Sequence, residues 1–131
     1  MKYALKALIY IANHKDGLAI ASAIAAETAI PKKFLEQILL ELKKGRIINS
    51  KQGNVGGYYF VKDPKDVNLV DVYRLIEGPI AWVPCVSKTF YEPCSDCSNE
   101  TECRIRWAAF QIRDPMLEAM EQINIATLAA P

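Results

Sequence analysis

The sequence predicts a mainly α-helical fold that carries one small β-hairpin. Apolar residues recur at helical spacing through most of residues 3–44. The stretch 53–61 then reads Gly-Asn-Val-Gly-Gly-Tyr-Tyr-Phe-Val, in which glycines suited to a hairpin tip precede strand-forming side chains. A helical apolar stripe returns from Cys103 to about Asn124. These observations predict a helical domain, a hairpin and a long terminal helix, in that order.

Three helices are expected before the hairpin. The first covers residues 3–14 and ends at Asp16–Gly17, and a second, alanine-rich helix covers about 21–28. The third covers about 31–44 and begins with Pro31, because proline is favoured at the first helical position. Its expected buried face consists of the apolar residues Phe34, Leu35, Ile38, Leu39 and Leu42.

The third helix and the hairpin together indicate DNA binding. A tight connection joins the second and third helices, as in a helix-turn-helix. A strand over about 46–50, a polar tip and a return strand over 58–61 follow directly, which makes a winged helix-turn-helix. The polar side chains on this surface are Lys32, Lys33, Glu36 and Gln37 on the helix and Lys51, Gln52 and Asn54 at the tip. From the tip, the latter three can reach phosphates or the minor groove.

The charge distribution supports the same interpretation. Residues 1–70 hold eleven Lys/Arg and six Asp/Glu, a net +5, whereas residues 71–131 hold five and nine, a net −4. A basic first half suits a polyanion such as double-stranded DNA. An enzyme is disfavoured, because the single histidine, His14, belongs to no nucleophile arrangement and the glycine run precedes a strand. No apolar run is long enough to span a membrane and no export signal is evident, so a cytoplasmic location without a membrane partner is expected.

The second half is expected to hold a helix, a loop and the long helix. A helix over about 69–77 stops at Gly78–Pro79, and residues 79–102 form a loop with little regular structure. The terminal helix carries so much apolar surface that it is a candidate dimerisation helix, with folding back onto its own domain as the alternative. Pro115 is expected to kink this helix or to start a separate one.

These elements divide the chain into three parts. Residues 1–66 form the winged helix-turn-helix DNA-binding domain, and residues 67–102 form a linking helix and a cysteine-bearing sensor loop. Residues 103–131 form the dimerisation helix and a tail, in which residues 126–129 add a short turn. All four cysteines fall within nineteen residues of one another, which indicates metal or redox chemistry in a chain without an export signal.

Five stretches of the chain, taken in order, carry a family resemblance. They are 3–8 (Tyr-Ala-Leu-Lys-Ala-Leu), 30–39 (Ile-Pro-Lys-Lys-Phe-Leu-Glu-Gln-Ile-Leu), 53–58 (Gly-Asn-Val-Gly-Gly-Tyr), 72–79 (Val-Tyr-Arg-Leu-Ile-Glu-Gly-Pro) and the cysteine loop that enters the long helix. Together they resemble the Rrf2 (Rrf-two) family of bacterial winged-helix transcriptional regulators over nearly the whole chain.

The resemblance implies a homodimer that binds a pseudo-palindromic operator. The third helix would enter the major groove, the wing would follow the adjacent minor groove, and the long helices would cross at the dimer interface. The implied contacts are Lys32, Lys33, Glu36 and Gln37 near bases and phosphates, and Ser50, Gln52, Asn54 and Gly56 at the wing. The family often has Arg-Gly where this chain has Gln52–Gly53. Because glutamine is neutral, the wing is expected to position the dimer more than to read sequence.

The resemblance also implies a cofactor. Many members of the family hold an iron–sulfur cluster with three cysteines in this loop, and the matching positions are Cys85, Cys97 and Cys103. A histidine that one member uses as a fourth ligand corresponds to Arg106, which cannot ligate, so Cys94 is the implied fourth ligand. A reversible disulfide between Cys94 and Cys97, or zinc held by the four thiolates, remains the alternative.

The expected function is therefore a dimeric DNA-binding transcriptional regulator whose operator binding is modulated by the cluster. The loop joins the helix ending at Gly78 to the helix starting at Cys103. Gaining or losing a cluster would order or release this loop and change the spacing of the two winged domains. A thiol-redox or zinc-bearing winged-helix protein-interaction module is the alternative function.

Overall fold

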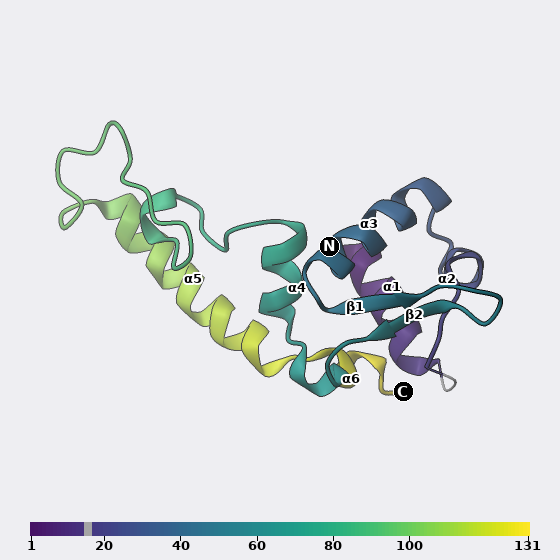
Figure 1. Cartoon of the computed structure of the whole chain (residues 1–131). Coiled ribbons are helices and arrows are strands. Elements are labelled where there is room, and N and C mark those ends of the chain that lie inside the picture. The colour runs from purple at the N-terminus through teal and green to yellow at the C-terminus, as the bar shows by residue number, and fades with distance from the viewer. Residues whose placement is uncertain (15–16) are drawn as a thin grey trace.

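The first half of the chain folds into three helices and a hairpin, as predicted (Figure 1). The structure, a computed structural model, describes residues 1–14 and 17–131, so the Asp16 of the expected helix end lies outside the described residues. The helices are α1 (Lys2–Asn13), α2 (Ala21–Thr28) and α3 (Lys32–Lys44). Pro31 precedes α3 with an extended backbone instead of opening the helix.

The wing is an antiparallel hairpin of β1 (Ile48–Lys51) and β2 (Gly57–Phe60). β1 begins two residues later than predicted, because Arg46 adopts a left-handed conformation with φ of 56° that turns the chain out of α3. A third strand segment, not predicted from the sequence, lies on the other edge of β2. There the backbone N–H of Ala19 donates to Tyr58 at 2.9 Å, and the Tyr58 N–H donates back at 2.8 Å.

The core of this domain lies between α1, α3 and the hairpin. Its α3 stripe consists of Leu35, Leu39 and Leu42, which recur at helical spacing. The prediction that Phe34 is buried is wrong, since its side chain is 55% exposed and its ring lies beside that of Tyr3, with 6.4 Å between centroids. Phe34 lies at the edge of the apolar stripe, where periodicity alone does not decide burial.

The second half begins with the short 3-10 turn η1 (Pro64–Asp66) and α4 (Leu69–Ile76). A further turn, η2 (Pro84–Val86), interrupts the long loop that leads to α5 (Arg104–Gln122). α5 runs through Pro115 without a break, so Pro115 does not start a separate helix. Pro115 is exposed, and water can therefore satisfy the carbonyl that lacks its helical partner. α5 leads away from the winged domain and places the cysteine loop at the opposite end of the molecule (Figure 1).

The last helix, α6 (Ile125–Ala129), is a core element and not merely a terminal turn. Ile125 is fully buried in the cluster that includes the apolar face of α1. The Ile125 N–H donates to the Val67 carbonyl at 2.9 Å, which ties the tail to the segment before α4. The division of the chain into residues 1–66, 67–102 and 103–131 remains a proposal. In this division, α6 of the third part packs against the first part. Within the described ranges, no helix is both long and apolar enough to cross a membrane.

Candidate functional site

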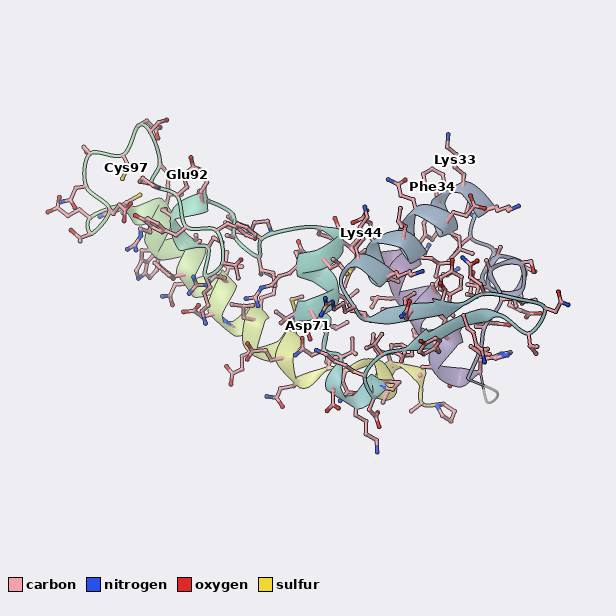
Figure 2. All side chains as sticks on the ribbon, in the orientation of Figure 1. Lys33, Phe34, Lys44, Asp71, Glu92 and Cys97 are labelled. Carbon is pink, nitrogen blue, oxygen red and sulfur yellow. The ribbon has the colours of Figure 1, made fainter. Side chains whose placement is uncertain are left out.

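The first two turns of α3 present a polar surface at the end of the molecule remote from the cysteine loop. Figure 2 shows Lys33 and Phe34 projecting from this end of α3. The exposed polar residues here are Lys32, Lys33, Glu36 and Gln37. Lys32 Nζ lies 4.0 Å from Glu36 Oε1, in an exposed pair that contributes at most about 0.5 kcal/mol. Both side chains can therefore exchange this contact for one with another partner.

The wing extends from the same end of the domain (Figure 1). Lys51, Gln52 and Asn54 are exposed at its tip. Ser50 is half-buried, and its Oγ accepts a hydrogen bond from Lys43 Nζ at 2.7 Å, which links the wing to the last turn of α3. The nine predicted DNA-contacting residues thus all lie on α3 or the wing, and their contacts with DNA remain predictions.

Glycine is required at the wing tip. Gly53 has a φ of 114°, which other residues rarely adopt. A side-chain carbon at Gly56 would lie 2.3 Å from the carbonyl oxygen of Lys51 and 2.9 Å from that of Gly53. The tip therefore closes on itself only with glycine at this position. A pocket of about 380 Å³ separates the tip from Ile20 and Ala21, where α2 begins.

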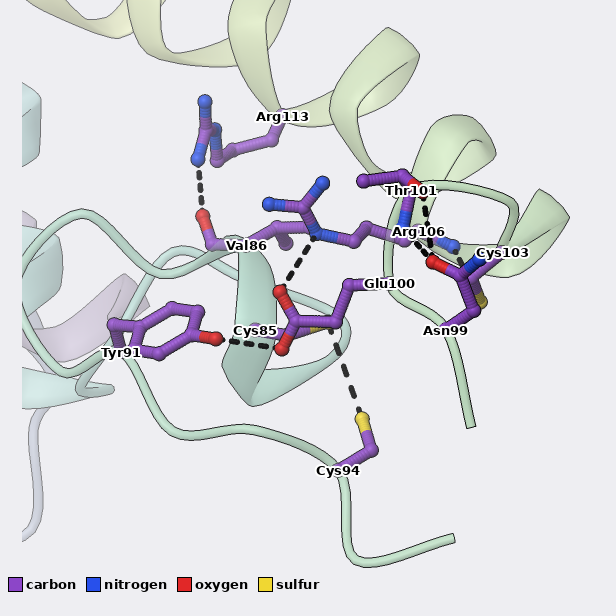
Figure 3. Close-up of polar contacts among 10 residues, drawn as sticks. All are labelled: Cys85, Val86, Tyr91, Cys94, Asn99, Glu100, Thr101, Cys103, Arg106 and Arg113. Carbon is purple, nitrogen blue, oxygen red and sulfur yellow. Dashed lines mark hydrogen bonds and ion pairs between the residues drawn. The ribbon is translucent and has the colours of Figure 1, made fainter. Parts of the chain in front are cut away.

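The four cysteines come together at the far end of the molecule, on three separate segments. Cys85 lies on η2, Cys94 and Cys97 lie in the loop, and Cys103 directly precedes α5. All four line a single pocket of about 290 Å³, and Arg106 contributes to its wall. Figure 3 shows three of the cysteines with their polar neighbours. The structure therefore unites the thiols that the sequence analysis grouped.

The thiols differ in their contacts. Cys94 donates a hydrogen bond to Cys85 Sγ at 3.9 Å, and the Sγ of Cys103 accepts from the Arg106 N–H at 3.4 Å at the start of α5. The hydrogen bond to Cys85, followed by burial and by the charges of Cys85 and Asp96, raises the pKa of the Cys94 thiol. All four cysteines are free.

The spacing of the thiols bears on which metal group they fit. Thiolates bound to one tetrahedral zinc at about 2.3 Å lie about 3.8 Å from one another. Among the described residues, no set of three or more His, Cys, Asp or Glu side chains is gathered closely enough for a single ion, although Cys85 and Cys94, 3.9 Å apart, are close to this spacing. An iron–sulfur cluster distributes its ligands over several irons and accepts wider spacing. Four thiols around one pocket are therefore a donor set that fits a cluster.

Arg113 holds η2, the turn that contains Cys85, against α5. The residue is only 8% exposed, and its side chain donates hydrogen bonds to the Val86 carbonyl and, from Nε at 2.8 Å, to Asp114 Oδ1. The ring of Phe110 stacks against its guanidinium group at 4.6 Å and against that of Arg106 at 4.8 Å. The role of Arg113 was not predicted, because its only signal in the sequence is a charge beside the apolar stripe of the long helix.

A second contact closes the loop beside the cysteines (Figure 3). Tyr91 Oη donates to Glu100 Oε1 at 2.5 Å, and Glu100 Oε2 lies 3.8 Å from Arg106 Nε. The hydrogen bond to the Glu100 carboxylate is the main reason that the pKa of Tyr91 is raised. Arg106 thus joins the loop to α5 through an ion pair, at the position where the resemblance places a ligand.

The fold and these two sites define a class of protein. A helix-turn-helix, a wing and an appended helix with a thiol-lined pocket are the parts of a winged-helix regulator. The family model described as Rrf2, an iron-dependent transcriptional regulator, matches residues 1–131, and the chain belongs to this family. The predicted resemblance and fold class are confirmed.

Individual relatives agree with the family assignment. An rrf2-like HTH-type transcriptional regulator of Rhodobacter capsulatus is 46% identical over 135 residues, which cover 99% of this chain and 89% of the relative. The solved structure of CymR, the global cysteine regulator of B. subtilis, has a TM-score of 0.76 at 26% identity and covers 98% of this chain and 91% of its own. The IscR structure from T. potens shares the fold, with a TM-score of 0.74 at 20% identity over 97% and 80% of the two chains. The family consists of transcriptional regulators and not of enzymes.

Proposed function

We propose that the chain is one subunit of a cytoplasmic homodimer that binds a pseudo-palindromic operator, and that an iron–sulfur cluster on its four cysteines sets the affinity for DNA. One observation carries this proposal. Thiols from η2, the loop and the start of α5 line one pocket, although they are separated by up to 18 residues in the sequence. The family description as iron-dependent regulators supports the choice of an iron cofactor.

The surroundings of the pocket suit an anionic cluster. Cys85, Cys94, Cys97 and Cys103 would be its ligands, and a bound cluster would supply a group that responds to iron, oxygen or nitric oxide. Arg106 at the pocket wall and the positive end of the 19-residue helix α5 place favourable charge beside the thiolates, which the carboxylate of Asp96 in the same lining partly offsets. Because no three metal-ligating side chains among the described residues are gathered for one ion, the arrangement favours this cofactor over a single zinc ion.

The α3 and wing surfaces are the proposed DNA contacts. Lys32, Lys33, Glu36 and Gln37 are exposed on the first turns of α3, as a helix that enters the major groove requires. Lys51, Gln52 and Asn54 are exposed at the wing tip, while Ser50 and Gly56 shape its backbone. With only one lysine among the tip side chains, the wing positions the protein through phosphate and sugar contacts.

An uncovered apolar face of α5 supports the dimer. Ile105, Ile112 and Met116 recur at spacings of seven and four, so they lie on one side of the helix. Their exposures are 67%, 40% and 37%. This side lies next to the face of α5 that packs on α4, and a second α5 would cover it.

The proposed coupling passes through the segments that carry the ligands. Arg113 holds η2, and therefore Cys85, on α5, whereas Cys94 and Cys97 lie in the loop that continues from α4. Ligation of all four thiols would fix the loop against the dimer helix. Because α4 also packs on α3, this restraint would alter how the two α3 helices are spaced on the DNA.

A thiol switch is the second candidate function, and one observation favours it. Cys85 and Cys94 are in contact at 3.9 Å, so a modest movement would bring their sulfurs to the 2.05 Å of a disulfide. This pair, rather than the predicted Cys94 and Cys97, is the one that the geometry favours. Oxidation would then link η2 to the loop.

Anaerobic purification tests the cofactor. The expected result is a brown protein that contains iron and sulfide, and loss of both from each cysteine-to-serine variant. Ser98→Ala is the matched control, because Ser98 lies exposed in the same loop between two of the cysteines. A colourless protein that contains zinc would contradict the cluster. A metal-free protein that forms a Cys85–Cys94 disulfide on oxidation would favour the switch.

A further inference from the structure

We propose that a second pocket, separate from the cysteines, binds a small organic carboxylate with an apolar body. The pocket has a volume of about 370 Å³, which is within the usual range for small-molecule sites. It lies where the end of α3, the base of the wing, α4 and the cysteine loop meet. Its lining residues are Gly45, Arg46, Ile47, Lys62, Val67, Asp71, Arg74, Leu75 and Phe90.

The polar side of the pocket selects an anion. Arg46, Lys62 and Arg74 face a single carboxylate, that of Asp71, so the lining carries two excess positive charges. Within the part of the chain that the structure describes, none of the three basic side chains forms an ion pair. The Nε of Arg74 is also buried without a hydrogen-bond partner. A buried charged donor without an acceptor is unfavourable, so the Arg74 guanidinium group would gain from an anionic partner in the pocket.

The rest of the pocket favours an apolar body attached to that anion. Ile47, Val67, Leu75 and Phe90 form its apolar wall, so Asp71 is the single carboxylate acceptor that the lining offers to the hydroxyl groups of a sugar phosphate. A guanidinium group binds a carboxylate through two parallel hydrogen bonds. The combination therefore fits a molecule such as an aromatic or branched aliphatic acid better than a nucleotide or free phosphate.

The position of the pocket makes it a suitable effector site. Phe90 comes from the cysteine loop, and its N–H donates to the Ser87 Oγ at 2.9 Å, which anchors it near the buried η2 turn. Arg46 lies at the base of the wing, at the left-handed turn out of α3. A ligand in this pocket would touch both the loop and the wing base. The inference concerns different residues from those that hold the proposed cluster, and it stands independently of that cluster.

Equilibrium dialysis of the full-length protein with radiolabelled benzoate tests the site. Benzoate is expected to bind saturably, with competition by unlabelled cyclohexanecarboxylate but not by benzamide, which has the same ring without the charge. Arg74→Gln and Lys62→Gln remove one cation each, and each is expected to weaken binding about tenfold. Lys65→Gln is the matched control, because Lys65 is an exposed lysine on η1 that does not line the pocket.

Several results would overturn the proposal. They are the absence of saturable binding in the millimolar range, equal binding by the wild type and both pocket variants, and competition by benzamide as strong as that by the acids. If Arg74→Gln does not fold, as judged by its circular dichroism, Lys62→Gln decides, because Lys62 is exposed and its replacement leaves the core intact. Equal weakening in Lys65→Gln would show general charge attraction instead of a site.

Discussion

Replacing Arg113 with methionine should release the turn that carries Cys85 from α5. The substitution leaves the Val86 carbonyl without its charged donor, which removes about 1.5–3 kcal/mol. It also removes the guanidinium stacking on Phe110, worth about 0.5–1 kcal/mol. Methionine keeps much of the buried volume, and the bond to half-exposed Asp114 contributes little, so no cavity term is added. The expected local loss is about 2–4 kcal/mol.

Amide hydrogen exchange measures this loss where it occurs. The Ser87 N–H donates to the Pro84 carbonyl at 3.0 Å inside η2, so its protection reports the opening of that turn. A loss of about 2 kcal/mol lowers its protection about thirtyfold. Arg104→Met is the matched control, because Arg104 is exposed at the start of the same helix. Unchanged Ser87 protection in Arg113→Met at equal protein concentration would refute the assigned role of Arg113.

Three further predictions concern the DNA surface, the dimer and the thiols. Lys33→Ala should weaken DNA binding and reduce the slope of log affinity against log salt by about 1 in fluorescence anisotropy, whereas Lys65→Ala should leave the slope unchanged. Ile112→Glu should produce monomers in light scattering. Gln111→Glu is the control, because it adds the same charge outside the apolar stripe and should leave the protein dimeric. A monomeric wild-type protein would contradict the interface. Because the pKa of the Cys94 thiol is raised, iodoacetamide should alkylate Cys94 in the metal-free protein more slowly than it alkylates an unstructured cysteine. The difference in rate should disappear as the pH rises past the raised pKa. Faster alkylation of Cys94 near neutral pH would contradict the hydrogen bond to Cys85.

The winged domain was largely predictable from sequence because its signals are local. The apolar period of α3 and the glycines of the wing each act over a few residues, and they gave the elements and their order. Phe34 was mispredicted because a position at the edge of a stripe becomes buried only if a neighbour covers it. The Ala19 bridge was missed because a strand of one residue has no periodicity.

The cysteine region was predictable in composition but not in geometry. The clustering of the cysteines in sequence indicated a common site, and the structure brings all four to one pocket. The contact between Cys85 and Cys94 and the role of Arg113 were not predictable, because each depends on how the loop folds back onto α5. Arg113 and Val86 are 27 residues apart, so no local pattern connects them. The burial of Ile125 was likewise invisible in a helix of five residues.

The central claim is that a cluster on the four cysteines sets the affinity of the dimer for DNA. To test this claim, a DNA duplex is first selected from random sequences by the wild-type protein under anaerobic conditions. The Kd of the protein for this duplex is then measured before and after removal of the cluster. The two Kd values should differ at least tenfold, which is about 1.4 kcal/mol of coupling, and a Cys94→Ser variant should always give the cluster-free value. Equal Kd values for the loaded and cluster-free protein would contradict the claim.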